Sequence, residues 1–123
     1  MWELYFENVE QPEKEIFSSQ AKFNTSYRKR KGIVTRKAKF DAEMEQKITN
    51  VAKKTYKNLN LNGYARIDMR VTSSGDVYVL EANPNPDIAL DDEFACSAKH
   101  IGLKYPQLIE KILKLSLAWA KKA

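Results

Sequence analysis

The sequence of 123 residues predicts an α+β fold in which an antiparallel sheet is flanked by helices. Two runs of alternating apolar and polar residues, 64–71 and 77–83, are joined by a short polar segment that contains Gly75, as in a β-hairpin. Segments with apolar residues at helical spacing precede and follow this hairpin. At this length we expect one domain over residues 1–123.

The first forty residues predict a short strand followed by a long loop. Residues 2–6 alternate large apolar and acidic side chains, as a strand does, and residues 11–14 read as a turn. Residues 18–39 show no sustained period and contain Gly32, so we expect mainly a loop there. A loop of this length in a compact domain is usually functional.

The predicted loop also carries the excess positive charge of the chain, whose net charge is +5. Such a stretch favours an anionic partner, phosphate or nucleic acid, although a solvated loop has the same composition. No acidic residue occurs between Ala21 and Phe40, where the basic residues are Lys22, Arg28, Lys29, Arg30, Lys31, Arg36, Lys37 and Lys39.

Three helices are predicted after the basic segment. The first begins at Asp41, which can cap it, and ends before residues 60–63. A short helix follows residues 91–92 and ends at Gly102. The last begins at Pro106, and its apolar residues cover so much of its circumference that we expect burial within this chain or against a partner.

The predicted hairpin sorts its residues by polarity if residues 73–76 form the loop, because strand side chains alternate between two faces. The polar face then carries the strongly polar groups of both strands, and the opposite face is apolar. The expected pairs are Arg66 with Asn83, Asp68 with Glu81 and Arg70 with Val79 on the polar face, and Ile67 with Ala82, Met69 with Leu80 and Val71 with Tyr78 on the other.

The pairing of Asp68 with Glu81 needs a cation, because two carboxylates about 5 Å apart repel each other by roughly 3 kcal/mol at an effective dielectric of about 20. Ion pairs with Arg66 and Arg70 would meet this need without a metal. The amide of Asn83 adds an oxygen of the kind that Mg²⁺ accepts. We therefore expect a magnesium site at Asp68, Glu81 and Asn83, with Arg66 beside the phosphates of a nucleotide.

Two stretches of the hairpin, Gly63–Arg70 and Tyr78–Pro86, resemble the metal-binding hairpin of ATP-grasp ligases, most closely the D-alanine:D-alanine ligase branch. Residues 98–102 and 106–110 are similar to the C-terminal helices of that branch, and the resemblance extends from about Ala21 to the C-terminus. It implies that the chain is the C-terminal portion of an ATP-grasp domain. The upstream half of that domain would be a partner, without which the chain is expected to be inactive.

The resemblance also implies cofactors, residue roles and a reaction. The cofactors would be ATP and Mg²⁺, with Mn²⁺ as a substitute, and the reaction an ATP-driven ligation of a carboxylate and an amine through an acyl phosphate. Asp68, Glu81 and Asn83 would bind the metal. Arg66 and Lys22 would be catalytic, Arg66 at the transferring phosphoryl group and Lys22 at the terminal phosphate, and both would contact the nucleotide together with Glu81.

The resemblance leaves both substrates unassigned. Asp87 and residues 91–93 are acidic where the D-alanine ligase pattern has small and serine-bearing residues that help to hold the acceptor, so D-alanine is not assigned as a substrate. A homodimer is compatible with the resemblance.

Composition limits the other kinds of site and function that the chain could have. Cys96 and His100 are the only residues of their types, too few for a Cys/His zinc site, and no apolar run is long enough for a membrane span, so we expect a cytoplasmic protein. The alternative function is a non-catalytic basic module that binds nucleic acid or another anion through residues 22–39. Nucleic acid is the less favoured partner, because only Phe23 and Tyr27 offer rings for base stacking.

Overall fold

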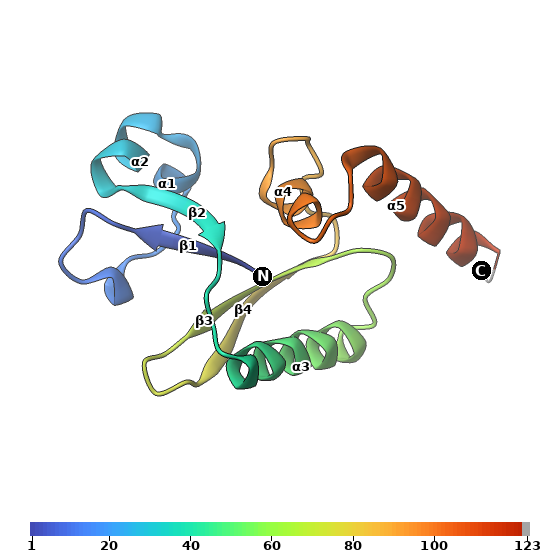
Figure 1. Cartoon of the computed structure of the whole chain (residues 1–123), viewed down its shortest axis with the longest axis horizontal. Helices are drawn as coiled ribbons and strands as arrows, with labels where there is room; N and C mark the ends of the chain where they lie inside the picture. Colours follow the sequence, from blue (N-terminus) through green and yellow to red (C-terminus); the bar gives the residue numbers. More distant parts are fainter. Residues whose placement is uncertain (122–123) are drawn as a thin grey trace. The chain divides into compact units, whose positions relative to one another are not determined.

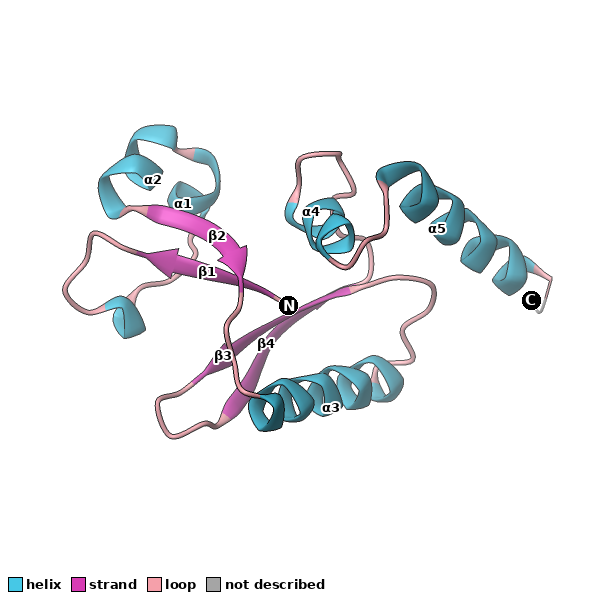
Figure 2. Ribbon diagram, viewed as in Figure 1, coloured by secondary structure: helices cyan, strands magenta, loops and turns pink. Residues whose placement is uncertain are grey.

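The computed structural model describes residues 1–121. The chain divides into two compact units, Met1–Ala38 and Lys39–Ala123, whereas the sequence predicts one domain over residues 1–123. Each unit is described by itself. The fold is α+β, with two antiparallel two-stranded sheets and helices, as predicted (Figure 2). Within residues 1–121 no helix has the length and apolar character needed to cross a membrane.

The first unit is built on a two-stranded ribbon. Strand β1 (Trp2–Phe6) pairs antiparallel with β2 (Ile33–Lys37), and between them lie a short 3-10 helix, η1 (Pro12–Lys14), and two helices, α1 (Ser19–Phe23) and α2 (Thr25–Lys31) (Figure 1). The side chains of Phe6, Ala21 and Ile33 form its small core, against which Tyr27 packs. The predicted strand at residues 2–6 is confirmed.

The prediction of a loop over residues 18–39 is wrong, because this segment folds into α1, α2 and β2. The Ser18 side chain accepts a hydrogen bond from the Ala21 amide and starts α1, and Asn24 does the same for α2 through Tyr27. Gly32 ends α2 with a φ of 61°, a conformation that glycine adopts without strain. The helices are too short to show an apolar period, and pairing with β1 makes Ile33–Lys37 a strand.

The second unit contains a hairpin and three helices. Helix α3 (Ala42–Asn58) precedes strands β3 (Arg66–Val71) and β4 (Val77–Asn83), which are followed by α4 (Glu93–His100) and α5 (Tyr105–Ala120). Helix α3 lies alongside β4 (Figure 1), and the Lys47 ammonium donates a hydrogen bond to the Gly75 carbonyl at the hairpin turn (2.6 Å). The predicted hairpin and three helices are thus confirmed.

The predicted register holds only for the half of the hairpin away from the turn. Arg66 pairs with Asn83, Ile67 with Ala82 and Asp68 with Glu81, as expected. A bulge at Leu80 shifts the remaining pairs by one residue, so the expected pairs of Arg70 with Val79, Met69 with Leu80 and Val71 with Tyr78 are wrong. The observed pairs are Met69 with Val79, Arg70 with Tyr78 and Val71 with Val77.

The bulge improves the match between the two strands near the turn. With one extra residue in β4, Val77 and Val79 face the apolar partners Val71 and Met69, and Tyr78 joins Arg70 on the polar face. The connection between the strands becomes a five-residue segment, in which the Thr72 amide donates to the Asp76 carbonyl (2.9 Å). The connection is one residue longer than predicted, and the bulge at Leu80 compensates for this shift, so the apolar residues of both strands stay on one face.

Helix α5 buries little of its apolar surface in this chain. Leu108 joins Ala95 and Ala98 of α4 in a small core, but Leu113, Leu117 and Trp119 are each more than half exposed. The expectation that α5 is buried within the chain is therefore wrong, while burial against a partner stays a prediction. The physical reason is that α4 covers only the first turns of α5.

The N-terminal cap of α3 provides a test of the second unit. The Asp41 carboxylate accepts a hydrogen bond from the Met44 amide (2.8 Å). We expect Asp41→Ala to lower the free energy of unfolding by about 1 kcal/mol, because the amide loses its partner. Asp41→Asn keeps an acceptor and should cost less than half of that. Denaturant unfolding followed by circular dichroism measures both, and equal losses would contradict the cap assignment.

Candidate functional site

The polar face of the hairpin centres on the pairing of Asp68 with Glu81. Cross-strand partners point to the same side of a sheet, so the two carboxylates share one face with Arg66 and Asn83, the next pair on that face. Asp68, Arg66 and Asn83 are half-buried and Glu81 is exposed. The site is therefore open to a solute and lies outside the apolar core.

In this structure Arg66 neutralises Asp68. The guanidinium donates two hydrogen bonds to the carboxylate, from Nε to Oδ1 (2.8 Å) and from Nη2 to Oδ2 (3.0 Å). These bonds, followed by the negative charges of Asp68, Glu93 and Glu81, raise the pKa of Arg66 above its usual value, although burial opposes the shift. Part of the metal-free ion-pair arrangement considered from the sequence is thus present.

The amide of Asn83 is held by the segment that follows β4. The Asn83 Oδ1 atom accepts a hydrogen bond from the Asn85 backbone amide (2.9 Å), and the Asn85 side chain in turn accepts one from the Tyr64 hydroxyl (2.9 Å). An amide oxygen has two lone pairs, so this bond orients Asn83 and leaves one lone pair for another partner.

The first turn of α4 approaches the same end of the hairpin. The Phe94 ring lies against the ring of Tyr64, with centroids 5.5 Å apart. Its neighbour Glu93 places Oε2 at 3.9 Å from Nη1 of Arg66. Sequence reasoning predicted no contact of Glu93, Tyr64 or Asn85 with the site residues, because these contacts depend on how α4 and the loop after β4 dock on the hairpin.

The donor set fits a hard divalent cation. Two carboxylates and an amide oxygen on one face are ligands that Mg²⁺ and Mn²⁺ accept. Within residues 1–121 no three His, Cys, Asp or Glu side chains gather closely enough to hold a metal by themselves, so a metal on this face would need Asn83 as a third protein ligand. A cation here would also neutralise the exposed Glu81 carboxylate, to which these two hydrogen bonds from Arg66 do not extend.

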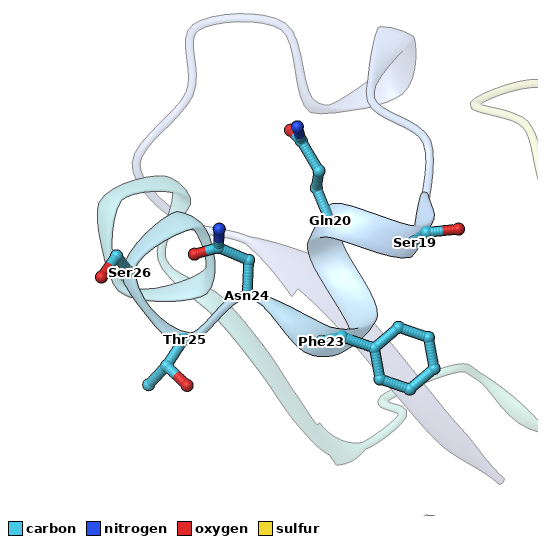
Figure 3. A pocket seen from close by; sticks show the side chains of 6 residues that line it. All are labelled: Ser19, Gln20, Phe23, Asn24, Thr25 and Ser26. Atoms are coloured by element: carbon cyan, nitrogen blue, oxygen red, sulfur yellow. The ribbon is translucent and has the colours of Figure 1, made fainter.

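Lys22 lies in the first unit, on α1, whereas the hairpin belongs to the second unit. Its side chain is exposed, and the ammonium lies 5.7 Å from the centre of the Phe17 ring. A surface hollow next to it is lined by Ser19, Gln20, Phe23, Asn24, Thr25 and Ser26 (Figure 3). Phe23 is 83% exposed, and Figure 3 shows its ring pointing away from Asn24, Thr25 and Ser26.

The chain is similar to D-alanine–D-alanine ligases in sequence. A ligase of that name from Haemophilus influenzae (strain PittEE) is 32% identical over 109 residues, which cover 86% of this chain and 34% of the relative. The ligase of Lactococcus lactis subsp. cremoris (strain MG1363) is 36% identical over 94 residues, covering 76% and 27%. The vancomycin C-type resistance protein VanC1 of Enterococcus gallinarum is 31% identical with the same coverage.

A solved structure and a family model agree with these relatives. The crystal structure of D-alanine–D-alanine ligase from Bacillus anthracis complexed with ATP matches with a TM-score of 0.69 and 28% identity, covering 73% of this chain and 31% of that one. The chain thus spans about a third of the length of the relatives it matches. The model described as "D-ala D-ala ligase C-terminus" matches residues 7–114, and the chain therefore belongs to the family of D-alanine–D-alanine ligase C-terminal domains.

Proposed function

We propose that this chain forms the metal- and phosphate-binding part of an ATP-dependent carboxylate–amine ligase. The observation that carries the proposal is the pairing of Asp68 with Glu81 on an open polar face, flanked by Arg66 and Asn83. Membership of the ligase family supports it. The proposed cofactors are ATP and Mg²⁺, for which Mn²⁺ can substitute, and the proposed location is the cytoplasm, where ATP is available.

The proposed reaction has two steps. A substrate carboxylate oxygen attacks the terminal phosphorus of ATP, the bond from that phosphorus to ADP breaks, and an acyl phosphate forms. An amine nitrogen then attacks the acyl carbon, loses a proton and releases phosphate. The metal, when bound, would supply positive charge for the phosphate oxygens. The carboxylate and the amine of the substrates remain unassigned.

Each site residue has a role that follows from its chemistry. Asp68, Glu81 and Asn83 would hold the metal through oxygen atoms. Arg66 keeps its charge at neutral pH and presents planar N–H donors that match phosphate oxygens, which suits the transferring phosphoryl group. Lys22 would add a positive charge at the terminal phosphate.

The contacts of the basic segment in the first unit argue against the alternative function, a module that binds nucleic acid. Several of its cations already contact groups of their own unit. Arg28 donates to the Ala21 carbonyl (2.7 Å), Lys31 pairs with Glu15 (2.6 Å) and Arg36 pairs with Glu7 (2.8 Å). A nucleic acid would have to compete with these contacts, so we favour the ligase.

The metal assignment is tested by Asp68→Asn and Glu81→Gln in the full-length protein. Each change keeps the size of the side chain but removes a negative charge, so Mn²⁺ affinity in the presence of ATP should fall by at least about tenfold, and ADP release with it. Electron paramagnetic resonance of free Mn²⁺ measures the affinity. Asp76→Asn, at the turn of the same hairpin, is the matched control. Unchanged Mn²⁺ binding in both variants, with the fold intact, would refute the assignment.

The role of Lys22 predicts a kinetic defect. We expect Lys22→Met to lower kcat by at least about tenfold, because the terminal phosphate loses a positive charge in the transition state. Lys29→Met removes an exposed lysine of α2 and serves as the control, with kcat within about twofold of the parent. Steady-state measurement of ADP formation distinguishes the two. Similar values of kcat for both variants would show that Lys22 has no special role.

A further inference from the structure

The guanidinium of Arg66 lies between two carboxylates that come from different parts of the second unit. Its Nε and Nη2 atoms bond Asp68, two residues along the same strand. Its Nη1 atom faces Glu93, the first residue of α4, at 3.9 Å. This distance is too long for a direct hydrogen bond but short enough for an ion pair. The two edges of one guanidinium are thus divided between two anions.

The position of Glu93 follows from the docking of α4. Phe94 contacts Tyr64, which precedes β3 by two residues, so the first turn of α4 lies at the start of β3. The positive end of the helix favours a carboxylate at this position. The side chain of Glu93 is 34% exposed and that of Arg66 is 26% exposed, so the pair is less screened by water than an ion pair on an open surface.

Asp68 has two competing partners in the proposed function. As a metal ligand it must turn oxygen lone pairs toward a divalent cation, which repels the guanidinium that bonds the same carboxylate. Arg66 has a flexible side chain and would move away from the hairpin without a second anion. Glu93 is such an anion, and it does not belong to the proposed ligand set.

We propose that Glu93 is a positioning residue for Arg66: it holds the Nη1 edge of the guanidinium, so that Arg66 stays beside the phosphate site when Asp68 binds metal. The proposal rests on the proposed function for its role in nucleotide binding. The contact itself is a property of the ligand-free protein. Glu93 acts through Arg66 and is assigned no contact with nucleotide or metal.

The first experiment tests the contact without any ligand. Glu93→Gln keeps the size of the side chain and removes its charge. We expect the Nε–H proton of Arg66, observed by nuclear magnetic resonance, to exchange with water about twofold to fivefold faster in this variant. Glu110→Gln is the control, because Glu110 pairs with Lys114 on α5 and should leave Arg66 unchanged. An Arg66 exchange rate equal to that of the parent in Glu93→Gln would overturn the proposal.

The second experiment tests whether Glu93 acts through Arg66, by measuring MgATP affinity of the full-length protein in a double-mutant cycle. Glu93→Gln should weaken MgATP binding by about twofold to fivefold in the parent and by less than about 1.5-fold in the Arg66→Ala background. Equal weakening in both backgrounds would overturn the proposal. If the parent itself binds no MgATP, the proposed function fails, and the proton-exchange result alone decides the role of Glu93.

Discussion

Two carboxylates that face each other across the β3–β4 hairpin impose the main constraint on the candidate site. Asp68 and Glu81 sit at directly paired positions and on one face, so their charges must be neutralised from that face. Arg66 meets part of this need in the ligand-free structure through two hydrogen bonds to Asp68. The same constraint explains why the face suits a divalent cation, which would neutralise both carboxylates at once.

The supporting contacts around this pair come from the chain on both sides of the hairpin. Tyr64, before β3, holds Asn85, which orients Asn83, and the ring of Tyr64 also meets Phe94 of α4. Contacts of this kind restrict the orientation of the side chains that could bind a metal. The proposed positioning role of Glu93 extends this arrangement to Arg66.

The second unit leaves much apolar surface exposed, on α5 and on β4. Leu113 and Leu117 of α5 and Leu80 of β4 are each more than half exposed. Among residues 1–121 no large side chain is fully buried. These side chains therefore do not belong to a closed core within the described residues.

The sequence by itself determined the hairpin, its three neighbouring helices and the pairing of Asp68 with Glu81, because these follow from local period, caps and strand alternation. The prediction from sequence was wrong at residues 18–39, because β2 becomes a strand only by pairing with β1. It also missed the bulge at Leu80, because a bulge depends on how two neighbouring strands match. Only the tertiary structure placed Glu93 beside Arg66. That contact joins residues 27 positions apart through the docking of α4, and no local pattern encodes such a distance.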